Sequence, residues 1–267
     1  MPADFTINKA AEMGFCAGAR QAIKKAKQAC QKYGQVQMLG DIVHNENVVH
    51  DLAEQGVLVV DSLESANKDI PILFRAHGTP VELWEKAQEM GFEIIDATCP
   101  LVKEIHDCAK SLKEENRTIF IIGDKGHDEV IGIASQVKNP IIISNIDDIP
   151  DKRYSKVGIV IQSTQNIDKV KKIVGGIIEN VGDLKIYNTI CKPTRQRQSE
   201  VKKLARKNDL VIIIGSFTSA NTKRLVQVAK EINPATYQVE SPDDLDKSWF
   251  EDIDIVGISA GPSTPDS

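Results

Sequence analysis

The sequence predicts an α/β protein built on parallel sheets, and three features of the chain support that prediction. Short β-branched runs alternate with segments of helical periodicity. Most of these runs end in a short polar turn and then enter a helical segment. A pattern of cysteine and polar residues also returns three times along the chain. Because ligands gather at the carboxyl ends of parallel strands, the turns after the runs should hold the functional residues.

Composition narrows the class of protein. A chain of 267 residues can bury a large core in one to three domains. A net charge of −5 with no long basic run argues against a nucleic-acid partner. No apolar stretch reaches the roughly 20 residues that cross a bilayer, and the N-terminus lacks the pattern of a secretory signal. We therefore expect a cytoplasmic protein with no membrane partner, in which the five cysteines stay reduced.

The expected elements follow in order along the chain. Strands are expected at 36–40, 71–76, 93–97, 118–123, 156–162, 184–190, 210–215 and 254–260. Helical patterns follow many of them, for example at 80–90 and 166–176. Cys30, Cys108 and Trp84 lie within such helical patterns, so we expect them to serve in packing. We assign His50 and His106 to the surface.

Cysteine and polar residues recur three times in the turns after the expected strands. Three strand-to-helix turns carry Cys16, Cys99 and Cys191, separated by 83 (99 − 16) and 92 (191 − 99) residues. A second polar turn follows each cysteine after 28, 28 and 30 residues, with His44, His127 and Asn221. A third turn in each block holds His77, then Ser163 and Thr164, then Ser263. We therefore expect three α/β modules, at 8–92, 93–184 and 185–267.

The residue types in these turns favour a particular chemistry. A cysteine at a helix N-terminus meets unpaired N–H groups, which favour the thiolate. Three thiolates at a pseudo-threefold axis suit an iron–sulfur cluster. A [4Fe–4S] cluster normally takes four cysteines, so three would leave one iron open. An open iron can act as a Lewis acid on a hydroxyl while the cluster supplies electrons.

The remaining polar residues indicate an anion site and a proton donor. Histidines, hydroxyls and an amide at helix N-termini suit phosphate oxygens; they are His44, His77, His127, Ser219, Asn221 and Ser263. Walker A and G-x-G-x-x-G sequences are absent from the chain, so the sequence gives little support for a mononucleotide or dinucleotide as the ligand. Glu129 lies two residues after His127, where a carboxylic acid could pass protons to a bound group.

At these residues the chain closely resembles the 4-hydroxy-3-methylbut-2-enyl diphosphate reductases, which finish the methylerythritol phosphate route to isoprenoid precursors. The matching stretches are GFCAG, HNENVVHDLAEQGV, AHGTP, DATCPLV, GHDEVIG, TICKPTRQRQ, GSFTSAN and AGPSTPD. The resemblance implies a trefoil of three α/β modules around a [4Fe–4S] cluster. It also implies that two electrons and two protons remove an allylic hydroxyl as water, giving isopentenyl and dimethylallyl diphosphate. Electrons would arrive singly from a ferredoxin or flavodoxin.

The resemblance also implies roles for single residues. Cys16, Cys99 and Cys191 would ligate the cluster, and Glu129 would relay protons. Ser163 would contact the alcohol of the substrate, with Thr164 beside it. The diphosphate pocket would be lined by His44, His77, Ser219, Asn221 and Ser263, with His127 close to both diphosphate and cluster.

Two departures from the family pattern stand out. The usual Ser-Ser-Asn of the substrate-binding motif reads Ser219-Ala220-Asn221, so one hydroxyl donor is missing. Losing one hydrogen bond to a charged group weakens binding by roughly 1.5–3 kcal/mol if nothing replaces it. The chain also stops at PSTPDS, where a helix follows in the first two blocks. We expect a shortened chain with one face of the third module uncovered, which an added C-terminal helix would stabilise.

Two alternatives stay open at this point. A three-cysteine [4Fe–4S] dehydratase of the quinolinate synthase type would share the open iron but bind carboxylates. A non-catalytic phosphate-binding paralogue would need no cluster at all. A brown protein with iron and sulfide would exclude the paralogue, and turnover of the allylic diphosphate would separate the two enzymes.

Overall fold

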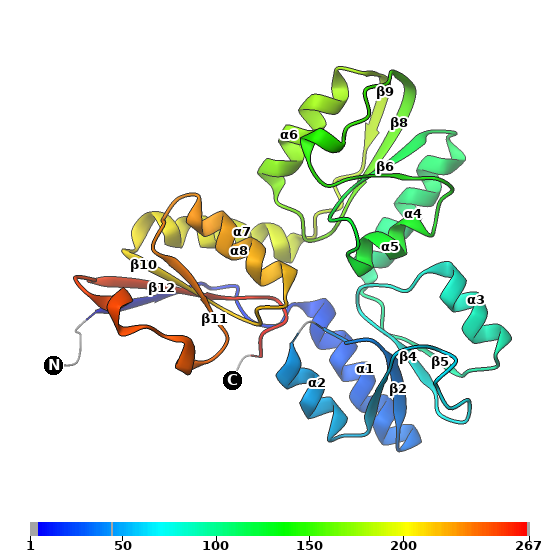
Figure 1. Ribbon diagram of the computed structural model, residues 1–267, viewed down its shortest axis with the longest axis horizontal. Helices are drawn as coiled ribbons and strands as arrows, with labels where there is room; N and C mark the ends of the chain where they lie inside the picture. Colours follow the sequence, from blue (N-terminus) through cyan, green and yellow to red (C-terminus); the bar gives the residue numbers. More distant parts are fainter. Residues whose placement is uncertain (1–4, 44, 266–267) are drawn as a thin grey trace. The chain divides into compact units, whose positions relative to one another are not determined.

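The computed structural model describes residues 5–43 and 45–265 (Figure 1). Its contacts divide the chain into two compact units. The first comprises Met1–Arg20, Val43–Asp51 and Lys192–Ser267, and the second comprises Gln21–Ile42 and Leu52–Cys191. Two helices, α1 (Ala17–Tyr33) and α2 (Glu46–Ala53), run through points at which this division cuts the chain. None of the helices in the described ranges is long and apolar enough to span a bilayer.

The first unit contains one parallel sheet of four strands in the order β1-β12-β10-β11. The strands are β1 (Thr6–Lys9), β10 (Leu210–Ile214), β11 (Thr236–Val239) and β12 (Ile255–Ala260). The helices are α7 (Lys192–Lys207) and α8 (Ala220–Lys230), with two 3₁₀ turns, η2 (Pro242–Asp244) and η3 (Lys247–Phe250). Every pair of neighbouring strands is parallel, as expected for α/β units.

Both faces of this sheet are covered at its central strand β10. Val211 and Ile213 pack with buried residues of α7 and α8 on one face. On the other face Ile212 is in a cluster with Trp249 and Phe250 of the η3 segment. The expectation of an uncovered face is therefore wrong, because aromatic side chains take the place that a helix fills elsewhere.

The second unit contains two parallel sheets, in the orders β3-β2-β4-β5 and β7-β6-β8-β9. The first has β2 (Val36–Leu39), β3 (Val57–Val60), β4 (Ile72–Phe74) and β5 (Ile94–Asp96). The second has β6 (Thr118–Ile122), β7 (Ile141–Ile143), β8 (Tyr154–Ile161) and β9 (Val181–Ile186). Helices in this unit are α3 (Val81–Glu89), α4 (Pro100–Glu114), α5 (Asp128–Ala134) and α6 (Ile167–Ile178), with the turn η1 (Ile146–Asp148).

Strand β6 shows why these runs are apolar throughout. Phe120 and Ile122 pack on the α6 side, in a cluster that includes Val170 and Ile173. Ile119 and Ile121 point the other way, into a cluster with residues of α4 and α5. Because side chains alternate along a strand, a sheet covered on both faces needs an apolar residue at every position. The prediction of an α/β protein with three parallel sheets is confirmed.

Long-range pairing closes each sheet. The strands ahead of Cys99 and Cys191 join sheets whose other strands precede them, so β5 pairs with β4 and β9 pairs with β8. The strand ahead of Cys16 differs, because β1 pairs with the later strand β12, with Thr6 and Ile255 249 residues apart (255 − 6). The expected module limits place β4 and β5 on opposite sides of the 92/93 boundary, while 184/185 falls within β9. The three-module division therefore stays a proposal, since the hydrogen-bonded sheets do not follow its limits.

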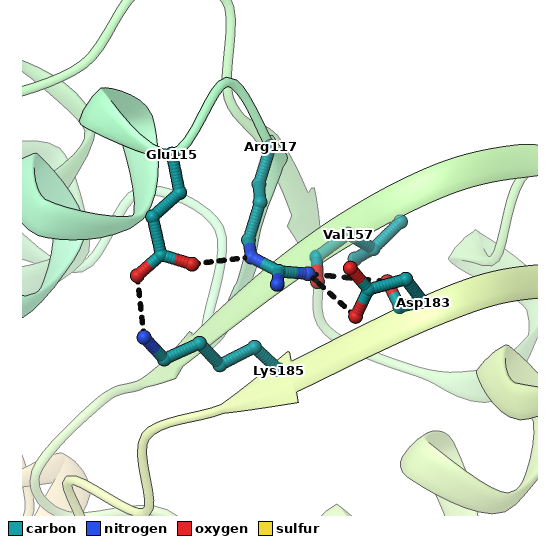
Figure 2. Close-up of polar contacts among 5 residues, drawn as sticks. All are labelled: Glu115, Arg117, Val157, Asp183 and Lys185. Carbon is teal, nitrogen blue, oxygen red and sulfur yellow. Dashed lines mark hydrogen bonds and ion pairs between the residues drawn. The ribbon is translucent and has the colours of Figure 1, made fainter.

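A charged cluster anchors the end of α4 to the sheet (Figure 2). Arg117 donates from Nε to a carboxylate oxygen of Glu115 at 2.8 Å and from Nη1 to Asp183 Oδ1 at 3.0 Å. The same Nη1 reaches the carbonyl of Val157 at 3.3 Å, and Lys185 pairs with Glu115. The hydrogen bonds from Lys185 and then Arg117 hold the pKa of the Glu115 carboxyl below its usual value. The cluster thus joins the chain after α4 to two neighbouring strands.

Several packing predictions can be checked directly. Cys30 is buried and Cys108 packs against a core cluster, and burial raises the pKa of both thiols. Trp84 packs edge-on against Phe74 with ring centroids 4.8 Å apart. The packing assignments of all three residues are confirmed. His50 lies on the surface of α2, as expected.

Candidate functional site

All three predicted cysteines lie immediately before a helix. Cys99 is the N-cap of α4, whose first residue is Pro100. Cys191 directly precedes α7, and Cys16 directly precedes α1. The Sγ atom of Cys16 accepts a hydrogen bond from the backbone N–H of Ala19 at 3.4 Å. Unpaired N–H groups at helix starts favour the thiolate form, so each position suits a metal ligand.

Each of the three cysteines also makes a backbone hydrogen bond of the same kind, from its own N–H to a carbonyl in another turn. The N–H of Cys99 donates to the carbonyl of Ala76 at 3.0 Å, and that of Cys191 donates to Ser163 at 2.9 Å. In the first unit the N–H of Cys16 donates to the carbonyl of Pro262 at 3.1 Å. The acceptors lie in the turns after β4, β8 and β12, which carry the third polar residue of each predicted block. Each cysteine is thus joined to the last turn of the preceding block, and Cys16 to that of the final one.

Glu129 and Ser163 form a buried polar pair in the second unit. Glu129 is only 1% exposed and follows the N-cap of α5. The Ser163 hydroxyl donates to Oε2 of Glu129 at 2.7 Å, and the Ser163 backbone N–H donates to Oε1. Both carboxylate oxygens therefore accept hydrogen bonds from one residue of the turn after β8. Charge-assisted bonds of this kind fix the position of the carboxylate.

Gln162 organises the same turn, and sequence reasoning did not single it out. Its side chain is fully buried, and its Oε1 accepts the backbone N–H of Asp124 at 2.9 Å. Its Nε2 donates to Thr164 Oγ1 at 3.1 Å. One amide thereby ties the turn after β6 to the turn after β8. A buried amide with both ends used in this way orients its neighbours.

His77 and His127, both in the second unit, lie close together. The rings of His77 and His127 meet edge to face with centroids 5.9 Å apart. His127 caps α5 by accepting the N–H of Glu129 on Nδ1 at 3.2 Å, so in the neutral ring the proton is on Nε2. Arg75 pairs with Asp128 at 2.8 Å, which joins the His77 turn to the start of α5. The structure thus brings the His77 turn close to His127 and Glu129, and their common role in a site stays a prediction.

His106 corrects a prediction. It was assigned to the surface, but it is half-buried, and its Nε2 has no hydrogen-bond partner among residues 5–43 and 45–265. Its ring faces Gly78 and Gly132, where an added Cβ would lie 3.2 and 3.5 Å from the imidazole. Burial lowers the pKa of His106 to about 4, with a smaller contribution from Lys110. Helical periodicity alone could not reveal that two glycines leave room for this ring.

The hydroxyls of the first unit gather at the start of α8. Ser219 is 2% exposed and caps the helix, with its Oγ accepting the N–H of Thr222 at 3.3 Å. Ser263 is 8% exposed, and its hydroxyl reaches the Ser219 hydroxyl at 3.4 Å. Ala220 is the first residue of the helix, and Asn221 follows it, half-buried. A helix start with hydroxyl groups is suited to phosphate oxygens. His44, expected in the same pocket, lies outside the described residues.

A residue that the sequence did not single out fixes this turn. The carboxylate of Glu46, at the start of α2, accepts hydrogen bonds from Ser216 at 2.7 Å and Thr218 at 2.8 Å. These two bonds hold the pKa of Glu46 below its usual value. Gly215 permits the sharp path of the turn, because its φ is +147° and a Cβ there would lie 2.7 Å from Thr222 and Thr264. The sequence around Glu46 contains no motif that predicts its hydrogen bonds to Ser216 and Thr218.

Comparisons with known proteins cover almost the whole chain. The family described as "LytB protein" matches residues 7–267. The 4-hydroxy-3-methylbut-2-enyl diphosphate reductase of Aquifex aeolicus is 40% identical over 95% of this chain and 89% of the relative. The enzyme of the same name from Geobacter sulfurreducens is 39% identical, over 94% and 90% respectively.

Solved structures give the same result. The E-1-hydroxy-2-methyl-but-2-enyl-4-diphosphate reductase of Plasmodium falciparum aligns with a TM-score of 0.93 at 27% identity. It covers 98% of this chain and 85% of its own. A second structure, an (E)-4-hydroxy-3-methyl-but-2-enyl diphosphate reductase described as the terminal enzyme of the non-mevalonate pathway, aligns with a TM-score of 0.72 at 39% identity. That alignment covers 98% and 95% of the two chains.

Proposed function

The chain belongs to the LytB family, and we infer from that membership that it reduces 4-hydroxy-3-methylbut-2-enyl diphosphate. The reaction takes up two electrons and two protons, breaks the allylic C–O bond and releases water. Isopentenyl and dimethylallyl diphosphate are the products, and they supply isoprenoid synthesis. The relatives named above are all reductases of this kind, so the dehydratase and phosphate-binding alternatives are not retained.

We propose that Cys16, Cys99 and Cys191 hold one [4Fe–4S] cluster with one iron free of cysteine. The donor set fits this group, because the three cysteines form no disulfide and each lies immediately before a helix start. When bound, the cluster supplies single electrons and an iron that can bind the substrate hydroxyl. Cys30 and Cys108 do not fit this role, since burial raises the pKa of their thiols.

Glu129 and Ser163 are proposed to handle the protons. The carboxyl of Glu129 would deliver a proton to the leaving hydroxyl, and Ser163 would contact the alcohol oxygen, with Thr164 beside it. The two hydrogen bonds from Ser163 support this assignment, because a proton carrier has to be held within hydrogen-bond reach of its target. The buried position of the pair keeps bulk water away from the carboxylate.

The diphosphate is proposed to bind His77, His127, Ser219, Asn221, Ser263 and His44. The Nε2–H of His127 suits a phosphate oxygen, since its Nδ1 is used in capping α5. Ser219 and Asn221 are at the start of α8, where the helix dipole favours negative charge. Ala220 offers only its backbone N–H, so this chain uses one side-chain donor fewer than the Ser-Ser-Asn motif provides.

The electron donor is proposed to be a ferredoxin or flavodoxin, because each delivers electrons one at a time. A cytoplasmic location is proposed because none of the five cysteines forms a disulfide, as is usual in a reducing compartment.

A matched pair of variants on α4 tests the cofactor and the function together. Cys99 caps the helix, whereas Cys108 lies nine residues further along it (108 − 99). After anaerobic purification, the wild type and Cys108→Ser should each contain about four iron and four sulfide per chain. Cys99→Ser should lose most of the iron and all turnover of the allylic diphosphate. A Cys99→Ser protein with full iron content would contradict the ligand assignment, and an iron-loaded wild type that leaves the diphosphate unreduced would contradict the function.

A further inference from the structure

Arg197 is a buried cation on α7, five residues into the helix after Lys192 (197 − 192). Only 4% of the residue is exposed. Its Nη2 donates to the backbone carbonyl of Gly14 at 2.8 Å. Its Nε is buried and has no hydrogen-bond partner in the part of the chain that the structure describes. A neutral carbonyl is thus the partner of a charged guanidinium.

No carboxylate among residues 5–43 and 45–265 forms an ion pair with Arg197. Other basic residues of α7, such as Lys203 and Arg206, are exposed and solvated, so they need no partner. Arginine is almost never fully buried unless it is paired, because removal of the charge from water is costly. A buried unpaired cation therefore points to an anion that joins the folded protein.

The contact with Gly14 indicates which anion this is. Gly14 lies two residues before Cys16 (16 − 14), in the segment that leads to the first cysteine turn. We propose that Arg197 is the buried counter-charge of the cluster that Cys16 helps to hold, a proposal that rests on the proposed function. It is a positioning residue, because it fixes the Cys16 segment through the Gly14 carbonyl. Its charge also stabilises an added electron, since reduction makes the cluster and its thiolates more negative.

Two substitutions separate charge from shape. Arg197→Lys keeps the positive charge, while Arg197→Gln removes the charge and keeps an uncharged N–H donor. In the metal-free protein, Arg197→Gln should unfold at the same urea concentration as the wild type or at a higher one, because an uncompensated buried charge is gone. A lower midpoint in both variants, or failure of Arg197→Gln to fold, would assign a purely structural role and overturn the proposal.

The second measurement is a redox titration of the cluster-loaded proteins with dithionite, followed by electron paramagnetic resonance. The equilibrium constant for one-electron reduction should fall at least tenfold in Arg197→Gln, which is about 59 mV toward more negative potential. Arg197→Lys should stay near the wild type, and Lys203→Gln, on the exposed side of the same helix, should not shift at all. Equal potentials in Arg197→Gln and wild type would refute the proposal.

Two further outcomes keep this proposal distinct from the proposed function. A higher KM for the allylic diphosphate in Arg197→Gln, with an unchanged potential, would show that the charge serves the substrate, and it would overturn the assignment to the cluster. A wild type that binds no iron would remove the proposed function. The metal-free comparison would then still decide whether Arg197 is an uncompensated charge.

Discussion

Glu129 and Glu46 use the same structural device in two different surroundings. Each lies in the first turn of a short helix, where the helix dipole favours a carboxylate. Each accepts two hydrogen bonds from a strand-end turn distant in sequence, Glu129 from Ser163 and Glu46 from Ser216 and Thr218. Glu129 is 1% exposed, whereas Glu46 is exposed to water. Burial, not hydrogen-bond count, should therefore decide how much each carboxylate contributes.

The difference follows from the solvent. A buried carboxylate that loses a donor has no water to replace it, so the full desolvation cost of the group appears. An exposed carboxylate recovers most of the loss from water and is screened by salt. Glu129 is thus suited to a chemical task, and Glu46 to holding a turn in place. Four experiments test this contrast.

The largest effect is expected for Glu129→Gln. The amide keeps the size of the side chain but cannot deliver a proton, so turnover should fall about 10²–10⁴-fold. Iron content should stay at the wild-type level, as metal analysis will show. Glu46→Gln is the matched control and should retain turnover. A Glu129→Gln enzyme with more than a tenth of wild-type activity would remove Glu129 from the proton path.

Ser163→Ala should have the next largest effect. It leaves Oε2 of the buried Glu129 without its hydroxyl donor, which costs about 1.5–3 kcal/mol of unfolding free energy because the acceptor is charged. Urea unfolding of the metal-free protein measures this cost. Ser163→Thr keeps the hydroxyl and serves as the control. Equal stability of the Ala and wild-type proteins would mean that the pair is not enclosed from water.

Glu46→Gln should be mild and dependent on pH. At neutral pH the loss should be below about 1 kcal/mol, as for other exposed charged contacts. The pKa of Glu46 is lowered on folding, so its stabilising effect is present above the unfolded carboxyl pKa and is lost as pH falls through the folded pKa. Unfolding curves of wild type and variant should therefore converge in acid. If the stability difference between wild type and Glu46→Gln instead grows as the pH is lowered, Glu46 does not stabilise the protein as a carboxylate with a lowered pKa.

The smallest effect is expected for Lys185→Gln, in the charged cluster of Figure 2. The variant removes the Lys185–Glu115 ion pair and leaves the contact between Arg117 and Glu115 in place. The thermal midpoint should fall slightly in low salt and match the wild type in 0.5 M salt, since screening acts over about 3–10 Å at these ionic strengths. A salt-independent loss would show that packing, not charge, links these residues.

The parts of the structure that local chemistry determines could be predicted from the sequence. The cysteines were placed at helix starts because a strand, a polar turn and a helical period follow one another along the chain. Ser219 and His127 were found for the same reason. The roles of Glu46 and Gln162 could not be predicted, because their partners lie in turns that folding, not sequence, brings close. The sequence also could not predict which sheet contains β1, β5 or β9, since the pairing of strands far apart in the chain depends on packing.

The pairing of β1 with β12 has a consequence for the order of biogenesis. The first cysteine turn can obtain its native backbone partner, the carbonyl of Pro262, only after the chain has left the ribosome as far as that residue. Until then the nascent N-terminal strand has no neighbour to complete its sheet. A metal centre that needs Cys16 in its final place can consequently form only after the chain has been synthesised at least as far as Pro262.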